Sequence, residues 1–386
     1  MIFYNYVTPV KVYGLICCIL MLFLLEGCSR SSKADDQPVF TPTSIHYAKR
    51  FSITNKDNGL AVTVTSPDGF RKQYILREKS TMSSVAPAEV NIIGVPLQSV
   101  VCLASTHVAL INSLQQTDKI IGLESRKSVY NAEIIKSVEA GKIHEIGNYD
   151  DLNLELLVNI HPDVVFQSVG GMPSSNASQL ESLSLQTVSI PAHYETHPLG
   201  RLEWIKFFAL FLDKQTYADS LFQQAEHSYK ATMQLVQGTA HRPTVVAGYF
   251  SKGVWVAPGG KSYFAQLLQD AGADYIWKDD STSGNLKLSY EELVSRGMTA
   301  DYFINIQMVY KDRKQVLVDI SEAKSFKSVL TNKFYMNNAT TNVNGKNNYW
   351  EQGFTEPQVI LKDLVKILHP ELIPDYTPVY FTDQRQ

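Results

Sequence analysis

The chain has 386 residues, of which 44% are apolar, and its formal net charge is −3. This length allows one or two domains, and the apolar fraction is enough to fill hydrophobic cores. The balanced charge, with no long block of one sign, argues against a nucleic-acid partner, which would need a concentrated basic face. Only Cys102 lies beyond residue 28, in an apolar stretch, so a disulfide framework is excluded and Cys102 is expected in the core.

The first 27 residues have the pattern of a cleaved export signal. Lys11 supplies a positive charge, and residues 15–25 form an apolar run that is too short to span a bilayer comfortably. The tetrapeptide Leu25-Glu26-Gly27-Cys28 then resembles the lipobox of bacterial lipoproteins, in which the cysteine is lipidated. We expect Cys28 to be the lipid anchor and residues 28–44 to be a flexible tether; an uncleaved N-terminal anchor is the alternative.

Residues 45–90 are expected to form a small antiparallel β extension. Apolar and polar residues alternate over 47–54, 59–65 and 72–77, and Asn58-Gly59 and Asp68-Gly69 supply turn signals. The sequence assigns no role to this extension, and packing on the first lobe is the default expectation.

Two α/β lobes are predicted, at residues 91–195 and 239–386. Strands are expected at 98–104, 119–123, 163–167 and 185–191 in the first lobe, and at 244–250, 253–260 and 301–306 in the second. Because strands alternate with helical segments, the first lobe should hold a parallel sheet with ligand contacts at the strand ends. A closing helix is expected over 357–368.

A helical connection at residues 196–238 separates the lobes. Apolar residues recur at helical spacing over 198–212 and again over 216–237, and Pro198 suits the first turn of a helix. The flanking segments look like copies of one design: Asn153-Leu-Glu155 precedes Asp163 and a strand, and Ser289-Tyr-Glu291 precedes Asp301 and a strand. The pattern indicates two similar lobes joined by a long helix, with a ligand in the cleft between them.

Common catalytic signatures are missing from the sequence. It has no G-x-S-x-G and no Cys-x-x-Cys, and a phosphate loop ending at Ser262 would need glycine where Trp255 stands. His193, Glu195 and His197 form the densest group of potential metal ligands, which is either a zinc or manganese site or a polar inter-lobe loop.

Glu155 and Glu291 each follow a helix-capping residue, and Ser289-x-x-Glu292 fits a capping box that leaves Glu291 free. Both carboxylates are stabilised by the helix N-terminus. They either stabilise the starts of their own helices or present one acidic contact on each lobe to a two-subunit partner.

The chain resembles the substrate-binding lipoproteins of ABC importers for iron chelates and cobalamin, whose two α/β lobes are joined by a rigid helix. The resemblance covers residues 91–373 and leaves the β extension outside. It is carried by the order and spacing of Val100-Val-Cys-Leu-Ala-Ser-Thr-His-Val-Ala-Leu, Asn153-Leu-Glu, His161-Pro-Asp-Val-Val-Phe, Val254-Trp-Val-Ala-Pro-Gly-Gly, Ser289-Tyr-Glu and Asn347-Asn-Tyr-Trp-Glu-Gln-Gly.

This resemblance implies an α/β fold of two Rossmann-like lobes joined by a long rigid helix, with modest lobe motion. It implies a monomeric binding protein that is not an enzyme and has no cofactor, anchored by lipid on the periplasmic side of the cell envelope. Its cleft would capture an iron–siderophore or similar metal chelate for an ABC permease dimer, with Glu155 and Glu291 docking on permease arginines. By family position the expected ligand-binding residues are Ser105, Thr106, His107, Arg126, Tyr130, Gly170, Gly171, Tyr249, Trp255, Tyr349 and Trp350.

Other functions remain open at this point. Cobalamin is the alternative ligand, and haem is less expected because Tyr149 is displaced from the expected ligating position. His107 is either an axial ligand to such a metal or a locally bonded histidine at a helix start. A metal-dependent envelope hydrolase using His193, Glu195 and His197, and a purely structural envelope lipoprotein, are the alternatives from other classes.

Overall fold

The computed structural model of the chain describes Met1 and residues 43–56, 59–82, 91–147, 151–169, 180, 183, 185–307 and 311–383. Apart from Met1 and residues 43–44, the expected signal and tether lie outside the described residues, as do Cys28, Tyr149, Gly170 and Gly171. Every element discussed below lies in one compact unit, Pro42–Gln386. No helix among the described residues combines the length and apolarity that crossing a bilayer requires.

The first lobe is built on a five-stranded parallel sheet in the order β7-β6-β5-β8-β9. The strands are β5 (Val100–Cys102), β6 (Ile120–Leu123), β7 (His144–Glu145), β8 (Val164–Ser168) and β9 (Thr187–Ile190). The first strand in sequence lies at the centre, and the chain adds strands on one side and then on the other. This is the Rossmann-like order, and it places a topological switch point between β5 and β8, where ligands tend to bind.

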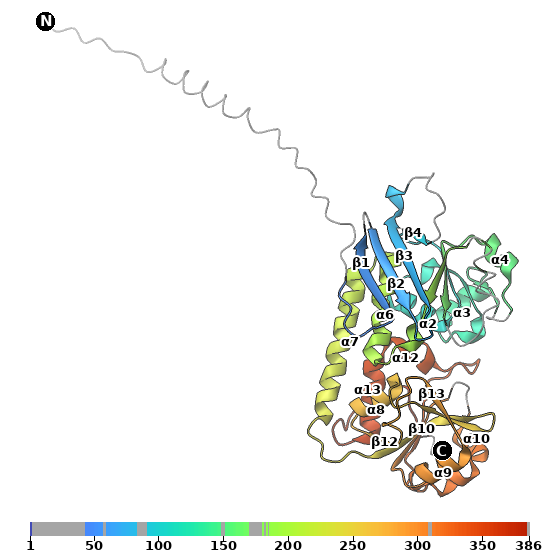
Figure 1. Ribbon diagram of the computed structural model, residues 1–386, viewed down its shortest axis with the longest axis vertical. Helices are drawn as coiled ribbons and strands as arrows, with labels where there is room; N and C mark the ends of the chain where they lie inside the picture. The colour runs from blue at the N-terminus through green and yellow to red at the C-terminus, as the bar shows by residue number, and fades with distance from the viewer. Residues whose placement is uncertain are drawn as a thin grey trace. The chain divides into compact units, whose positions relative to one another are not determined.

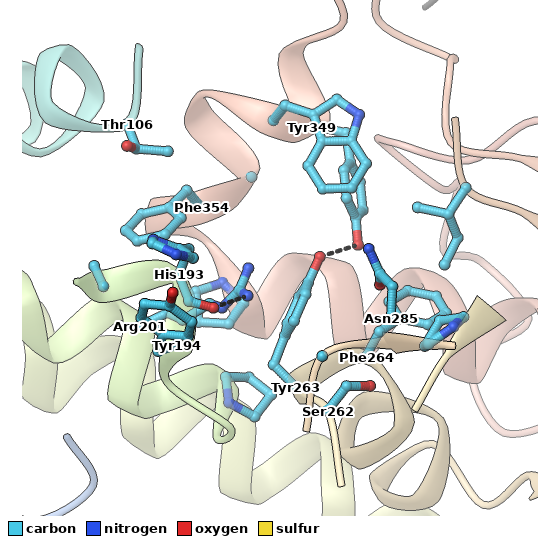
Figure 2. A pocket seen from close by; sticks show the side chains of 18 of the residues that line it. Thr106, His193, Tyr194, Arg201, Ser262, Tyr263, Phe264, Asn285, Tyr349 and Phe354 are labelled. Atoms are coloured by element: carbon cyan, nitrogen blue, oxygen red, sulfur yellow. Dashed lines mark hydrogen bonds between the residues drawn. The ribbon is translucent and has the colours of Figure 1, made fainter. Parts of the chain in front are cut away.

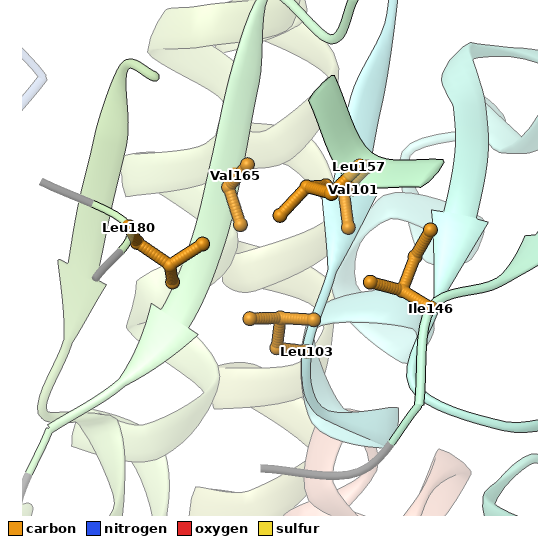
Figure 3. Packing of buried hydrophobic residues seen from close by; sticks show 6 residues of the cluster. All are labelled: Val101, Leu103, Ile146, Leu157, Val165 and Leu180. Atoms are coloured by element: carbon orange, nitrogen blue, oxygen red, sulfur yellow. The ribbon is translucent and has the colours of Figure 1, made fainter. Parts of the chain in front are cut away.

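Helices and apolar side chains cover this sheet. The helices are α2 (Ser105–Ser113), α3 (Ala132–Glu139) and α4 (Leu154–Asn159), with short 3₁₀ turns η2 (Thr117–Lys119) and η3 (Arg126–Ser128). On the face covered by α4, Figure 3 shows a fully buried cluster made of Val101, Leu103, Ile146, Leu157, Val165 and Leu180. The near-continuous apolar runs of β5 and β8 are typical of central strands covered on both faces.

The second lobe has a mixed sheet of parallel and antiparallel strand pairs. Its order is β13-β11-β10-β14-β15, and β12 pairs with the start of β10. The strands are β10 (Thr244–Ser251), β11 (Val254–Pro258), β12 (Asp274–Tyr275), β13 (Asn285–Leu288), β14 (Tyr302–Asn305) and β15 (Phe334–Met336). Lys252 and Gly253 both have positive φ, so β10 and β11 form a tight antiparallel hairpin instead of two strands joined by a helix.

The helices of the second lobe are α8 (Tyr263–Asp270), α9 (Tyr290–Gly297), α10 (Arg313–Asp319), α11 (Lys327–Leu330), α12 (Gln352–Thr355) and α13 (Pro357–Leu368), with η5 (Ser321–Ser325) and η6 (Asn348–Trp350). The closing helix α13 begins and ends where the sequence predicts. It begins with proline in its first turn and buries Ile360, Leu364 and Leu368.

The connection between the lobes is a pair of helices, α6 (Pro198–Leu212) and α7 (Gln215–Val236). Asp213 adopts a left-handed conformation that ends α6, and α7 returns alongside it (Figure 1). All residues of α6 except Arg201 are buried, whereas α7 buries one face. At about 1.5 Å per residue α7 is about 33 Å long, and it packs on α6 and on α13 of the second lobe.

The N-terminal extension is a four-stranded sheet, β1 (Phe51–Lys56), β2 (Gly59–Thr65), β3 (Arg71–Glu78) and β4 (Ile92–Val95), with η1 (Lys79–Thr81) between the last two strands. The first three strands are antiparallel as predicted, and β4 adds a parallel pairing. The ring of Phe51 lies 4.7 Å from that of Trp204 in α6, and the Tyr74 hydroxyl accepts a hydrogen bond from the Ser189 amide of β9 at 2.8 Å. The extension therefore packs on α6 and on the edge of the first lobe.

Candidate functional site

A cavity of about 560 Å³ lies between the two lobes. The first lobe contributes the strand ends at Ser168 and Ile190, the start of α2, and the η4 turn (Ala192–Tyr194). The second lobe contributes β10, β11, the start of α8 and the segment around η6, and the start of α6 forms the base (Figure 2). The cavity thus meets the carboxyl ends of β8 and β9, as expected for an α/β fold.

Six of the residues predicted to bind ligand line this cavity: Ser105, Thr106, His107, Tyr249, Tyr349 and Trp350. The first three lie in the first turn of α2, immediately after the central strand β5. Tyr349 is 2% exposed, and its ring makes an edge contact with Trp350 at 4.8 Å, so the two aromatic residues of η6 pack together in the cavity wall.

Three other predicted residues lie elsewhere in the described structure. Trp255 is fully buried beneath the cavity and makes an edge contact with Phe303 at 5.5 Å. Neighbouring residues of a strand face opposite sides, so Val256 lines the cavity and Trp255 points into the core. Arg126 is exposed and lies 3.9 Å from both Glu139 and Glu145.

Tyr130 lies at a second, smaller cavity of about 290 Å³, between α2, the start of α3 and the η6–α12 segment. Its backbone amide donates to the buried Glu351 carboxylate at 2.5 Å, and Asn131 donates to the same carboxylate at 3.1 Å. The Asn342 side chain donates to the carbonyl of Val129 at 3.2 Å. These contacts tie the lobes together beside the main cavity, so Tyr130 takes part in an inter-lobe contact and not in the ligand pocket.

His107 is 1% exposed and packs beside the rings of Phe166 and Phe208, which also contact each other. Burial lowers the pKa of its imidazole to about 3, and Nδ1 has no hydrogen-bond partner among the described residues. A neutral ring packed against two phenylalanines is a core histidine at the cavity wall.

Arg201 is the main site residue that the sequence did not single out. Its guanidinium lies 3.4 Å from the centre of the Tyr263 ring and donates to the carbonyl of His193 at 2.9 Å (Figure 2). Burial lowers its pKa. It occupies the first turn of α6 and is the one residue of that fully described helix that is not buried. The available signal was a cation in the first turn of a mainly apolar helix, near the cluster at 193–197.

The charged residues that line the cavity are positive. Arg201 and Lys346 line it, and no aspartate or glutamate occurs among its described lining residues. Burial also lowers the pKa of Lys346. The remaining wall is largely aromatic: Tyr194, Tyr249, Tyr263, Phe264, Tyr349, Trp350 and Phe354. Such a pocket suits a ligand that carries negative charge and presents flat or apolar surfaces.

His193, Glu195 and His197 do not converge on a metal site. Glu195 is buried and accepts hydrogen bonds from the backbone amides of Lys49 and Arg50, while His197 Nδ1 caps α6 by accepting from the Leu199 amide at 3.1 Å. Only His193 lines the cavity. The described residues contain no group of three or more His, Cys, Asp or Glu side chains that could hold a metal ion. The described geometry therefore gives no support to a metal-dependent hydrolase at this cluster.

The two candidate docking carboxylates occupy equivalent places in the lobes. Glu155 and Glu291 are both exposed and both stand second in a helix, α4 and α9 respectively. Asn153 and Ser289 cap these helices by accepting from the amide three residues on. A hydrogen bond from its own backbone, and then one from Ser289, lower the pKa of Glu291.

Comparisons with known proteins agree with this architecture. A sequence profile of the periplasmic binding protein family matches residues 100–339. An uncharacterized lipoprotein of Methanocaldococcus jannaschii is 26% identical over 394 residues, covering 92% of each chain. A vitamin B12-binding protein of Vibrio campbellii is 22% identical over 203 residues, which are 52% of this chain and 68% of that one. The crystal structure of a possible iron-binding (periplasmic solute-binding) protein from Staphylococcus epidermidis matches with a TM-score of 0.56 at 16% identity, covering 71% of this chain and 100% of that one.

Proposed function

Because the chain belongs to the periplasmic binding protein family, we propose that it is the substrate-binding component of an ABC importer for an anionic, aromatic metal chelate such as an iron–siderophore. The chelate would occupy the inter-lobe cavity and be delivered to a permease dimer. The resemblance to a possible iron-binding protein and to a vitamin B12-binding protein supports this ligand class.

The observation that carries this proposal is the charge of the cavity. Arg201 and Lys346 face it, and the described lining has no carboxylate to neutralise them. The carboxylates that act on these cations, Glu195 on Arg201 and Glu351 and Glu124 on Lys346, lie outside the lining, so the cavity side of both cations can pair with an anionic ligand. Catecholate or carboxylate oxygens on a chelate would form this pairing, and the surrounding rings would stack on the chelate's flat groups.

Cobalamin is the second candidate, supported by the likeness to the vitamin B12-binding protein. The cavity charge distinguishes the two ligands, because cyanocobalamin is neutral overall and gains little from the charge of Arg201. Haem, whose two propionates are anionic, falls within the proposed class.

We further propose that Cys28 carries a lipid anchor in the cell envelope, in line with the lipoprotein relative, and that the protein acts as a monomer. In the proposed assembly Glu155 and Glu291 meet basic sockets on the two permease subunits.

The experiment compares chelates of opposite charge that carry the same metal. Quenching of tryptophan fluorescence, to which Trp350 in the cavity wall contributes, would be titrated with a ferric tricatecholate, ferrioxamine B, haemin and cyanocobalamin. We expect the anionic ferric tricatecholate to bind and the cationic ferrioxamine B to bind weakly or not at all. Tight binding of cyanocobalamin alone would replace the siderophore proposal with cobalamin capture.

The variant Arg201→Gln tests the source of this selectivity. Losing a charge-assisted contact of about 1.5–3 kcal/mol should weaken binding of the ferric tricatecholate by about 10- to 100-fold. Arg126→Gln is the matched control, because that arginine is exposed and lies outside the cavity. Unchanged affinity in Arg201→Gln, or an equal loss in Arg126→Gln, would contradict the assignment of the site.

A further inference from the structure

The N-terminal extension lies outside the residues matched by the family profile, yet it reaches the ligand cavity. Pro67, in the turn between β2 and β3, is exposed and lines the cavity. No other residue of the described extension does so. The extension therefore places one tight turn, and no strand, at the cavity rim.

This turn has a fixed conformation. The Ser66 amide donates to the Phe70 carbonyl at 3.0 Å, and Gly69, with φ of 90°, donates to the Ser66 carbonyl at 3.2 Å. The Asp68 carboxylate accepts from the Ser66 hydroxyl and from the Phe70 amide. Continuous β2–β3 pairing, ending at Thr65 opposite Arg71, supports the turn from below. A turn held in this way can act as a rigid part of the cavity wall.

Pro67 of this turn lines the same cavity as His193. The negative charge of Asp68 raises the pKa of His193, although burial and the charge of Arg201 outweigh it and lower that pKa to about 4. The His193 carbonyl in turn accepts the hydrogen bond from Arg201. Asp68 is thus a negative charge next to the segment that binds the guanidinium of Arg201.

The same extension holds that segment from behind. Glu195 accepts hydrogen bonds from the amides of Lys49 at 2.9 Å and Arg50 at 2.8 Å, and from Trp204 Nε1 at 3.2 Å. The Arg50 carbonyl accepts from the Thr65 amide at 2.8 Å, so the start of the extension is tied to the strand that leads into the turn. The cavity segment at 192–195 is therefore fixed between the extension and α6.

We propose that the β2–β3 turn is a specificity-determining wall of the ligand site. Pro67 limits the size of the chelate at the rim by occupying space there, and Asp68 sets an upper limit on its negative charge by repulsion. This inference rests on the proposed function, from which it takes the class of ligand. It adds a selection of that ligand by size and charge, made by a segment outside the residues that the family profile matches.

Two variants of the full chain separate these roles. Asp68→Asn removes the charge and should tighten binding of the ferric tricatecholate by about 2- to 5-fold, the effect of one exposed charge pair, with cyanocobalamin affinity unchanged. Replacing Pro67-Asp68-Gly69 by Asn-Gly keeps a hairpin turn while removing the wall. It should shift the ratio of affinities for a bulky and a small ferric catecholate by about tenfold or more in favour of the bulky one. Asp375→Asn, an exposed carboxylate outside the cavity, is the control and should change neither value.

The outcomes distinguish this inference from the proposed function. If the unaltered protein binds anionic chelates but the turn variants keep its selectivity, the inference is overturned and the function stands. If the unaltered protein binds none of the chelates, the proposed function fails. NMR titration of selectively labelled histidine then still tests whether the turn lies beside the cavity. A lower His193 pKa in Asp68→Asn would then support the turn's place beside the cavity, and an unchanged pKa would overturn it.

Discussion

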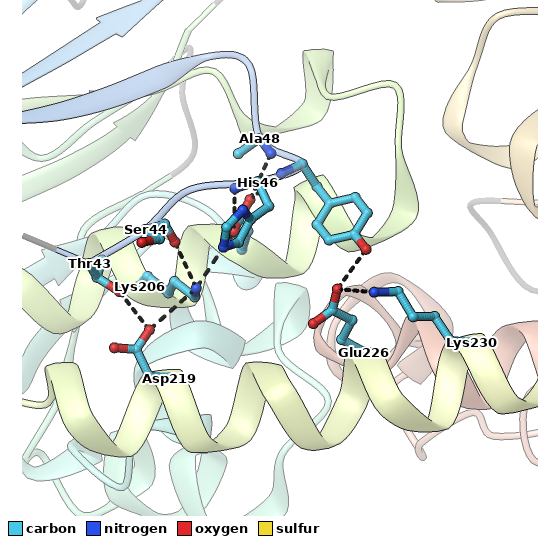
Figure 4. A network of polar contacts seen from close by, with 10 residues as sticks. Thr43, Ser44, His46, Ala48, Lys206, Asp219, Glu226 and Lys230 are labelled. Atoms are coloured by element: carbon cyan, nitrogen blue, oxygen red, sulfur yellow. Dashed lines mark hydrogen bonds and ion pairs between the residues drawn. The ribbon is translucent and has the colours of Figure 1, made fainter.

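At the scale of single residues, a buried carboxylate holds the N-terminal strap, by which we mean residues 43–50, on α6. Glu203 is 0% exposed and accepts from the amides of His46, Tyr47 and Ala48 at 2.9, 2.7 and 2.8 Å. Lys206, also buried, donates to the Ser44 carbonyl at 2.9 Å, and Figure 4 shows this network. The side chains of Glu203 and Lys206 can stay buried because backbone groups of the strap form hydrogen bonds with them.

Glu203→Ala should lower the free energy of unfolding by about 3–5 kcal/mol, because it leaves three backbone donors of the strap buried without their acceptor and removes one of the two carboxylates beside Lys206. Denaturant unfolding followed by circular dichroism would measure the loss. Glu226→Ala is the matched control: Glu226 also binds the strap, through the Tyr47 hydroxyl, but is partly exposed and should cost about 0–1 kcal/mol. Equal losses in the two variants would show that burial does not decide the strength of the contact.

At the scale of elements, both lobes use one aspartate to join the central strand to its neighbour. Asp163, just before β8, accepts from the amides of Gln98 and Ser99 ahead of β5 and pairs with Lys79 at 2.9 Å. Asp301, just before β14, accepts from the Thr244 amide and hydroxyl at the start of β10. The repeated sequence pattern thus corresponds to a repeated structural contact.

Asp301 should make the second lobe sensitive to acid. Burial raises the pKa of this carboxyl, but the contacts with Lys327 and Thr244 outweigh it and lower the pKa to about 2. A depressed carboxyl pKa stabilises the fold above its unfolded value near 4, and this stability is lost as the pH falls toward 2. Asp301→Asn should therefore lower the free energy of unfolding by about 2 kcal/mol at pH 7 and approach the unaltered protein near pH 2.

Urea unfolding at several pH values would measure this difference. Asp279→Asn, at an exposed carboxylate, is the control and should stay within about 0.5 kcal/mol of the unaltered protein. A deficit in Asp301→Asn that did not shrink as the pH fell would exclude the ionised carboxylate as its source.

Local signals explain why the elements were predictable. Pro198 and Pro357 begin α6 and α13, Asn153 and Ser289 cap α4 and α9, and these effects depend on a few neighbouring residues. The two-residue strand β7 was missed because so short a segment has no measurable alternation. The antiparallel hairpin of β10 and β11 was missed because the Lys252-Gly253 turn was not recognised as a hairpin signal.

The cavity was less predictable because its residues depend on which face of an element is turned inward. Trp255 and Val256 are neighbours on β11, yet Trp255 is buried in the core and Val256 lines the cavity. Arg201 becomes a site residue only because α6 is covered on every other side. Both facts depend on packing between distant segments, which spacing along the sequence does not encode.

At the scale of the whole folded unit, the lobes are connected on two sides of the cavity. The α6–α7 pair joins them, and Glu351 and Asn342 of the second lobe bind the backbone at residues 129–131 of the first. A buried carboxylate that accepts two amides resists separation of the lobes because opening would leave these groups unpaired. This arrangement favours small lobe motions, so recognition by a partner would depend on surfaces whose separation changes little on ligand binding.

Glu155 and Glu291 meet this requirement, since each is exposed at the start of a helix on a different lobe. A single exposed ion pair contributes only about 0–1 kcal/mol, so two at a fixed separation would orient docking more than they strengthen it. Reversing both charges, Glu155→Lys with Glu291→Lys, should abolish chelate uptake by cells while the affinity of the purified protein for the chelate stays unchanged. Each single reversal should leave partial uptake.

The matched control is Asp118→Lys with Asp279→Lys, which reverses one exposed carboxylate in each lobe outside these helix starts and should leave uptake intact. Uptake of labelled ferric tricatecholate and fluorescence titration of the same variants would be measured together. If affinity fell as far as uptake, the two glutamates would act on the ligand site and not on docking. If the control pair also abolished uptake, the effect would belong to the net charge of the protein, because a specific two-point contact depends on where the charges stand and not on their sum.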